Sequence, residues 1–255
     1  MEIIKVIILG IIQGITEFLP VSSSGHLVLF QHLLDVEGAL TLDVFLHFGT
    51  LLAVVIVYLD DIKGIITFRD EYRKLTIYII LGSVPAGVIG ILFEDLFERL
   101  FSTVTVVGFM LLLTGLLLWL SDRVGKEERD LKEMNLSDAV VIGFAQAFAI
   151  IPGISRSGST IVGGLFKGLN RKLAAKYSFL LSIPVIAGAT LLKVKDIVSG
   201  GLDADLLQLA VGTCSSLISG YFAIKLLLKL IDQEKLSLFA YYCWGLGILV
   251  ILFTR

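Results

Sequence analysis

Long, uninterrupted runs of apolar residues dominate the hydropathy pattern of this 255-residue chain. A helix needs about 20 mostly apolar residues to cross the ~30 Å hydrocarbon core of a bilayer. Six runs approach or reach that length, and we expect each to form one transmembrane helix: 42–59, 75–93, 103–120, 174–192, 206–230 and 238–253. The pattern therefore predicts an all-α integral membrane protein.

Two further apolar segments, 3–29 and 138–169, are each interrupted near the middle by polar and helix-breaking residues. Either both segments cross the membrane, or both enter it and return as re-entrant hairpins. Lysine and arginine concentrate on the cytoplasmic side of membrane proteins. With two hairpins, 15 of the 21 basic residues lie inside, five lie outside and Arg156 lies within the membrane; with eight full crossings the split is 12 against 8. The charge pattern favours the hairpins.

The two halves of the chain resemble each other. One alignment without a gap matches five unusual positions: Gly10 with Gly143, Gln13 with Gln146, Ser22 with Ser155, Ser24 with Ser157 and Gly25 with Gly158. We expect a single membrane domain, with repeat 1 at about 1–120, a cytoplasmic linker at about 121–137 and repeat 2 at about 138–255. Each repeat holds one hairpin and three crossings, so the second must be inverted relative to the first.

Composition agrees with a membrane protein. Apolar residues make up 56% of the chain, charged residues 17%, and the mean hydropathy is +0.92. These values exclude an ordinary water-soluble domain. The net charge of −2 gives no sign of nucleic-acid binding. Cys214 and Cys243 lie inside expected spans, where we interpret them as core residues.

The first polar interruption carries a carboxylate, hydroxyls and a histidine. Gln13 and Glu17 are four residues apart and share a helix face. A carboxylate at membrane depth costs about 2.5–3.5 kcal/mol on insertion scales, so it usually has a partner or a role. The serines of 22–24 and His26 follow directly. Each has an alternative reading: Glu17 as an interfacial residue, the serines as backbone-bonding groups and His26 as a core residue.

The second interruption, 152–160, places Arg156 among hydroxyl residues and glycines. A guanidinium is a planar fork of donors that suits phosphate oxygens, and the start of a helix near Thr160 adds free amides. The alternative is that Arg156 pairs with Glu17 and serves structure; a resting ion pair that opens would satisfy both readings. Together the groups suit phosphoryl transfer to or from a lipid-anchored substrate. His32 and His47 lack such neighbours, and we interpret them as structural.

Both motifs, Gln13-Gly-Ile-Thr-Glu17-Phe-Leu-Pro-Val-Ser-Ser-Ser-Gly-His26 and Pro152-Gly-Ile-Ser-Arg-Ser-Gly-Ser-Thr160, resemble the signatures of the undecaprenyl pyrophosphate phosphatase, or bacitracin-resistance, family. The resemblance covers nearly the whole chain. It implies hydrolysis of a polyprenyl diphosphate to the monophosphate, which recycles the lipid carrier for cell-wall and surface glycans. It also implies a multi-pass protein of the plasma or inner membrane whose site opens to the external face.

The resemblance also implies roles for individual residues. Ser23 is the favoured nucleophile with Ser22 as the runner-up, His26 handles the proton, and Glu17 orients it or holds a metal. The implied phosphate ligands are Arg156, Ser155, Ser157 and Thr160. A divalent cation, Mg²⁺ or Ca²⁺, is expected at Glu17 and Gln13, although the family often has Glu at position 13. The expected partners are the polyprenyl diphosphate and membrane lipid; the oligomeric state, including a homodimer, stays open.

A membrane transporter or lipid flippase is the alternative function, since inverted repeats with broken helices are typical of transporters. The serines and histidine beside the arginine favour chemistry, because binding alone needs no nucleophile.

Overall fold

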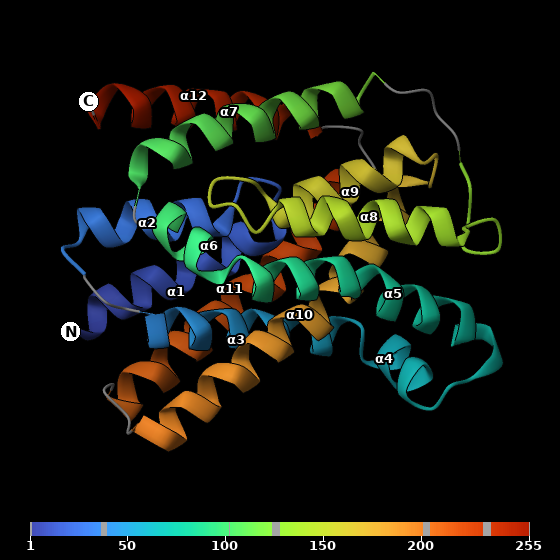
Figure 1. Ribbon diagram of the computed structural model, residues 1–255, viewed down its shortest axis with the longest axis horizontal. Coiled ribbons are helices and arrows are strands. Elements are labelled where there is room, and N and C mark those ends of the chain that lie inside the picture. Colours follow the sequence, from blue (N-terminus) through green and yellow to red (C-terminus); the bar gives the residue numbers. More distant parts are fainter. Residues whose placement is uncertain are drawn as a thin grey trace.

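The computed structural model describes residues 2–36, 40–101, 103–123, 128–200, 205–231 and 236–254. Helices account for nearly all regular structure in these residues, and most lie along the long axis of the molecule (Figure 1). The helices are α1 (Ile3–Phe18), α2 (Ser23–Leu33), α3 (Leu40–Val57), α4 (Leu59–Ile66), α5 (Asp70–Leu92), α6 (Glu94–Phe101), α7 (Val104–Ser121), α8 (Leu136–Phe148), α9 (Arg156–Phe166), α10 (Arg171–Gly200), α11 (Leu206–Ile231) and α12 (Leu236–Phe253).

Within the described residues, five helices are long and apolar enough to span a membrane: α5, α7, α10 up to Leu192, α11 and α12. They correspond to five of the six expected spans. The sixth, 42–59, corresponds to α3, which bends by 88° into α4. Many large apolar side chains on these helices are exposed, such as Ile80 at 54% and Phe222 at 64%. Such surfaces suit contact with lipid, and the chain is an all-α membrane protein.

The first interrupted segment folds as a helical hairpin. α1 ends at Phe18, and Pro20, which has no N–H to continue the helix, lies two residues later. The chain turns and continues into α2 at Ser23. Lys5 Nζ near the start of α1 donates to the carbonyl of Leu34 just past α2, at 2.7 Å. The segment therefore returns to the end of the molecule from which it started.

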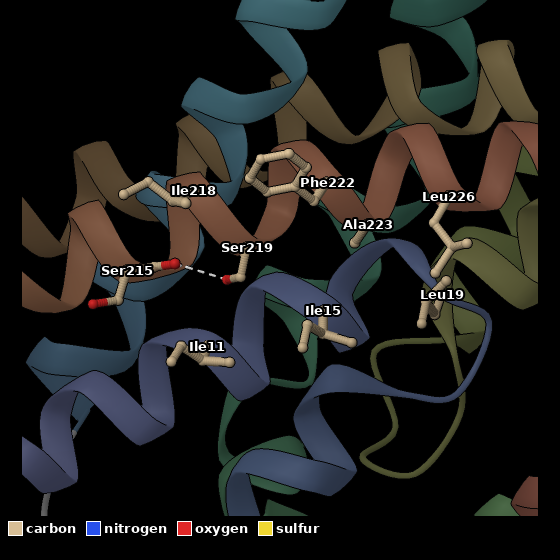
Figure 2. Close-up of a pocket in the computed structure, with 9 residues that line it drawn as sticks. All are labelled: Ile11, Ile15, Leu19, Ser215, Ile218, Ser219, Phe222, Ala223 and Leu226. Carbon is tan, nitrogen blue, oxygen red and sulfur yellow. Dashed lines mark hydrogen bonds between the residues drawn. The ribbon is translucent and has the colours of Figure 1, made fainter.

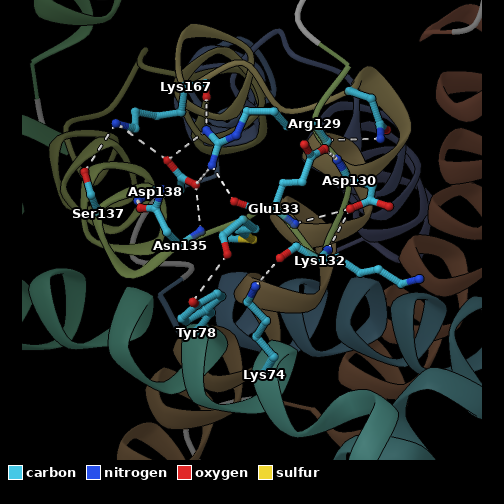
Figure 3. A network of polar contacts seen from close by, with 12 residues as sticks. Lys74, Tyr78, Arg129, Asp130, Lys132, Glu133, Asn135, Ser137, Asp138 and Lys167 are labelled. Carbon is cyan, nitrogen blue, oxygen red and sulfur yellow. Dashed lines mark hydrogen bonds and ion pairs between the residues drawn. The ribbon is translucent and has the colours of Figure 1, made fainter.

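The second interrupted segment forms the same kind of hairpin from α8 and α9. Its open end is held by a polar network (Figure 3). Arg129 donates to both Asp138, at the start of α8, and the carbonyl of Lys167, just past α9, while Lys167 Nζ lies 3.6 Å from Asp138. Asp138 is fully buried and also closes a capping box with Asn135. The network joins the two ends of this hairpin.

The loops expected on the cytoplasmic side meet at one end of the molecule, at the right in Figure 1. Three interactions join them: Lys176 with Asp61 at 2.6 Å, Lys74 with the carbonyl of Lys132 at 2.6 Å, and Arg171 with Asp122 at 3.4 Å. The N-terminus and the described end of α12 lie at the opposite end. Lys126, Lys235 and Arg255 of the charge count lie outside the described residues.

The helices pack through small residues on closely approaching backbones. A β-carbon at Gly10 of α1 would lie 2.7 Å from the β-carbon of Ser215 on α11, and one at Gly143 of α8 would lie 2.6 Å from the carbonyl oxygen of Gly82 on α5. Both contacts exclude any larger residue without a shift. In each hairpin the first helix therefore packs against a long helix from the other half of the chain, α1 against α11 and α8 against α5.

Candidate active site

The two hairpin tips share one backbone design. Ser22 caps α2 by accepting from the N–H of Gly25 at 3.2 Å, and Ser155 caps α9 by accepting from the N–H of Gly158 at 3.0 Å. Such caps satisfy one of the free amides at a helix start and leave others available. The tips differ in the backbone of the cap itself, since φ is 71° at Ser22 and −73° at Ser155. A positive φ is an uncommon conformation for a residue with a side chain.

The two tips interlock. A β-carbon at Gly25 would lie 3.2 Å from the Cα of Gly153, and one at Gly158 would lie 3.3 Å from the Cβ of Pro20. Ser157 Oγ also donates to the carbonyl of Leu19 at 3.3 Å. The N-termini of α2 and α9 therefore lie beside each other. Each helix start carries free amides and a partial positive charge, which favour an anion nearby.

Glu17 contacts the first residue of both α2 and α9 and is 6% exposed. Its Oε2 accepts from Ser23 Oγ at 2.6 Å and from Gln13 Nε2 at 2.9 Å. Its Oε1 accepts from Arg156 Nη2 at 2.5 Å, while Arg156 Nη1 donates to the carbonyl of Ser178 on α10. The structure thus joins the carboxylate and serine of one hairpin to the arginine of the other. The ion pair anticipated as the alternative reading of Arg156 is present.

His47, on α3, is a neighbour of this site that sequence reasoning treated as structural. Its Nε2 lies 3.7 Å from Glu17 Oε2, and its Nδ1 lies 2.8 Å from the carbonyl of Asp43. The sequence does not predict this contact, because the whole of α2 lies between Glu17 and His47 in the chain. A histidine inside a largely apolar span was the available signal.

His26 has a different environment from the one expected. Its Nδ1 lies 2.7 Å from the carbonyl of Ser22, and its Nε2 lies 2.7 Å from the hydroxyl of Tyr242 on α12. Both ring nitrogens therefore bond to groups other than Ser23 and Glu17. Tyr242 was not identified from the sequence, because tyrosines are common where membrane helices meet the interface.

The hydroxyls of the second motif are largely engaged in structural bonds. The helix begins at Arg156, earlier than the expected start near Thr160, because Ser155 is its cap. Ser155 and Ser157 bond to each other at 3.2 Å. Thr160 is fully buried, donates to the carbonyl of Arg156 and pairs with Ser178 Oγ at 2.6 Å. Phosphate binding by these three hydroxyls stays a prediction, and the geometry favours Arg156 and the helix amides as ligands.

The expected cation site has two oxygen donors. Gln13 is fully buried, and its Oε1 has no hydrogen-bond partner among the described residues. This orphaned oxygen lies on the residue that bonds Glu17. Mg²⁺ commonly takes one or two protein oxygens and completes its shell with water and substrate phosphate. Among the described residues, no cluster of three or more histidine, cysteine, aspartate or glutamate side chains is placed to hold a metal ion. A cation at Gln13 and Glu17 would therefore need water and substrate phosphate to complete its shell.

An apolar pocket of about 640 Å³ lies between α1 and α11 (Figure 2). Ile11, Ile15 and Leu19 form one wall, and Ile218 and Phe222 belong to the other. Ile11 and Ile15 are each two positions from Gln13 and Glu17, so they point to the opposite side of α1. The pocket is suited to hydrocarbon chains but is separated by α1 from the carboxylate.

Comparison with known proteins identifies the relatives of this chain. A family model described as bacitracin resistance protein BacA matches residues 6–249. Proteins named undecaprenyl-diphosphatase are similar to the chain over nearly their whole length. That of Halothermothrix orenii is 58% identical and covers 99% of this chain and 98% of its own, and that of Alkaliphilus metalliredigens is 49% identical with 100% and 99% covered. One from Methanobrevibacter smithii is 45% identical, with 98% and 97% covered.

Proposed function

The chain belongs to the bacitracin resistance protein BacA family, and we propose that it hydrolyses undecaprenyl diphosphate to the monophosphate and inorganic phosphate. It is a membrane enzyme, a phosphatase that acts on a phosphoric anhydride. The reaction returns the polyprenyl carrier to the form used in cell-wall and surface glycan synthesis. We place the protein in the plasma or inner membrane.

The observation that supports this chemistry best is the contact of Ser23 and Arg156 with the two oxygens of one carboxylate. Ser23 is only partly buried, so substrate can reach its hydroxyl. Glu17 is positioned to accept the hydroxyl proton, which makes the serine oxygen a stronger nucleophile. Arg156 is positioned to bind a phosphate once its contact with Glu17 opens.

The proposed reaction has two displacements. In the first, Ser23 Oγ attacks the terminal phosphorus, Glu17 takes the hydroxyl proton, and the bond from that phosphorus to the bridging oxygen breaks. The lipid monophosphate leaves with the electron pair. In the second, water attacks the phosphoserine and the bond from phosphorus to Ser23 Oγ breaks, while Glu17 returns its proton to Ser23 Oγ. The proton of the water goes to His26 Nε2 once the hydrogen bond of that nitrogen with the Tyr242 hydroxyl has opened. Arg156 and the helix amides stabilise the charge on the phosphoryl oxygens.

We propose that Gln13 and Glu17 hold the expected divalent cation. When bound, the cation supplies positive charge that neutralises the phosphate oxygens. The buried, unpartnered oxygen of Gln13 supports this assignment.

We further propose that both hairpins are re-entrant and that the halves are inverted repeats. Supporting this are the returning hairpins, the shared cap geometry and the gathering of the basic loops at one end. The test uses a variant of the protein without Cys214 and Cys243, into which a single cysteine is introduced at Lys132 or at Lys172. In intact cells, neither cysteine should be labelled by an impermeant maleimide until the membrane is opened. Labelling at 172 but not at 132 would mean that the second hairpin crosses the membrane.

A phosphate-release assay on detergent-solubilised protein tests the function. Diphosphates from C15 to C55 should each be tried with and without a chelator. We expect release of phosphate that is reduced by the chelator. A transporter or flippase, the alternative function, releases none.

A further inference from the structure

His47 presents a ring nitrogen to the carboxylate of Glu17. Its Nδ1 lies 2.8 Å from the carbonyl oxygen of Asp43, one turn earlier in α3. A carbonyl oxygen only accepts, so Nδ1 carries a hydrogen, and the uncharged ring then has its lone pair on Nε2. Nε2 lies 3.7 Å from Glu17 Oε2 and has no hydrogen-bond partner among the described residues. Two atoms that both carry lone pairs therefore lie close together, and a positive charge between them would stabilise the contact.

The other histidine near the hairpin tips differs from His47 in two respects. His26 Nε2 bonds to the hydroxyl of Tyr242 at 2.7 Å, and His26 is 3% exposed. The side chain of His47 is 31% exposed, although the side chain of Glu17 beside it is only 5% exposed. Water and dissolved ions can therefore reach the ring of His47, and its Nε2 has no bond that must first open.

One residue of α11 contacts both α1 and α3 close to the site. A β-carbon at Gly14 of α1 would lie 2.5 Å from the carbonyl oxygen of Ser216 on α11. The Ser216 hydroxyl donates to the carbonyl of Leu46 on α3 at 2.7 Å, and a β-carbon at Gly49 of α3 would overlap this hydroxyl. The gap between the carboxylate and the imidazole is therefore set by the close packing of three helices.

The separations around Glu17 Oε2 suit ligands of one cation. Two donors that each lie about 2.1 Å from the same ion are about 3–4 Å apart. The amide nitrogen of Gln13 lies 2.9 Å from Oε2, and His47 Nε2 lies 3.7 Å from it. Rotating the Gln13 amide by half a turn exchanges this nitrogen for the unpartnered amide oxygen. Arg156 contacts the other oxygen of the carboxylate, so an ion at Oε2 need not displace it.

We propose that His47 Nε2 is a third protein ligand of the divalent cation, beside the oxygens of Glu17 and Gln13. The bond from His47 Nδ1 to a backbone carbonyl agrees with this role, because histidines that bind metals usually donate their other N–H to a carbonyl or carboxylate. An imidazole ligand favours first-row transition-metal ions over Mg²⁺ and Ca²⁺, which prefer oxygen. The assignment rests on the cation expected for the proposed function, and it concerns binding of the ion rather than turnover.

Mn²⁺ is the probe for this site, because its pulsed electron paramagnetic resonance spectrum detects a directly bonded nitrogen. Inorganic phosphate, a product of the proposed reaction, is added to the detergent-solubilised protein in place of the substrate oxygens, so no turnover occurs. Protein labelled with ¹⁵N-histidine should show coupling of bound Mn²⁺ to ¹⁵N, and unlabelled protein should show coupling to ¹⁴N. Absence of bound Mn²⁺, or bound Mn²⁺ without histidine coupling, would overturn the proposal.

His47→Gln identifies the ligand, since it keeps a polar side chain and removes the imidazole. The histidine coupling should disappear, and the dissociation constant for Mn²⁺ should rise at least about tenfold. The dissociation constant for Mg²⁺, measured by competition with Mn²⁺, should change less than about threefold, because an amide oxygen suits Mg²⁺. His32→Gln is the matched control, since His32 is an exposed histidine of α2, and it should keep the wild-type coupling and affinities. Histidine coupling that persists in His47→Gln would overturn the assignment to His47.

The same spectra separate the role of His47 from the proposed function. A proton shared between Glu17 and His47 is the alternative explanation of their contact, and it predicts Mn²⁺ spectra without histidine coupling. In that case, phosphate release by the wild-type protein would support the proposed function while the ligand role of His47 is overturned. Histidine coupling that is lost in His47→Gln, in a protein that releases no phosphate, would support the ligand role and contradict the hydrolysis.

Discussion

The two hairpins have the same backbone plan but different chemical groups at matching positions. In both hairpins a serine caps the second helix and bonds to the serine two residues later. In both, a glycine lies three residues after the capping serine and donates its N–H to it. In the same alignment of the repeats, Glu17 matches Ile150 and Ser23 matches Arg156. Ser23 and Arg156 are each the first residue of their helix.

This difference separates the residues that build the turn from those that carry chemistry. Caps and glycines shared by both tips create two helix N-termini that pack together. The first helical position faces the region between them, and one tip places a hydroxyl there while the other places a cation. A symmetric pair of sites would need both groups twice. The molecule instead builds one site from two unlike halves, with Glu17 as the bridge.

The largest effect is expected from removing the hydroxyl of the first tip. Ser23→Ala should lower phosphate release at least about a thousandfold, because the nucleophile has no substitute, while lipid diphosphate binding persists. Ser24→Ala is the control, since the Ser24 hydroxyl contacts the neighbouring Ser22, at 3.3 Å, and not Glu17. If Ser22→Ala is inactive and Ser23→Ala is active, Ser22 and not Ser23 is the nucleophile. Activity in both would indicate direct attack by water.

The second tip is tested by Arg156→Lys. Lysine keeps the positive charge beside Glu17 but loses the planar fork, so we expect a loss of about a hundredfold in kcat/KM. Thermal stability in detergent should stay near wild type, since an ion pair with Glu17 can still form. Turnover near the wild-type level would show that Arg156 serves only structure.

The interactions that join the open ends of the two hairpins also differ, and this difference should affect the free energy of unfolding rather than activity. Asp138→Ala removes a fully buried carboxylate from Arg129 and Lys167 and should cost about 3 kcal/mol or more. Lys5→Ala removes one partly buried hydrogen bond and should cost about 1 kcal/mol. Thermal unfolding of both variants in the same detergent measures the difference. Equal shifts would mean that the network in Figure 3 stabilises the second hairpin no more than the single hydrogen bond of Lys5 stabilises the first.

Local signals in the sequence predict the spans well. The run 103–120 corresponds to α7 (Val104–Ser121) and the run 238–253 to α12 (Leu236–Phe253), because continuous apolar runs have few alternatives. The start of α9 was placed too late, since serine and glycine after Arg156 are typical of loops and the role of Ser155 in capping was not recognised. The bend between α3 and α4 also has no proline or glycine to mark it.

The motifs identify the central residues of the site but not the supporting ones. Glu17, Ser23 and Arg156 lie within two short, unusual segments and meet in the structure. His47 and Tyr242 reach the site from helices outside these motifs, and each belongs to a largely apolar run. Contacts of this kind depend on how helices pack, which periodicity and composition do not specify.

The configuration at the transferred phosphorus tests the central claim most directly. A polyprenyl diphosphate with a chiral, isotopically labelled terminal thiophosphate is hydrolysed, and the configuration of the released thiophosphate is determined. Attack by Ser23 followed by attack of water inverts the phosphorus twice, so this account predicts net retention. Net inversion would mean that water attacks directly, and the first hairpin would then not supply the nucleophile.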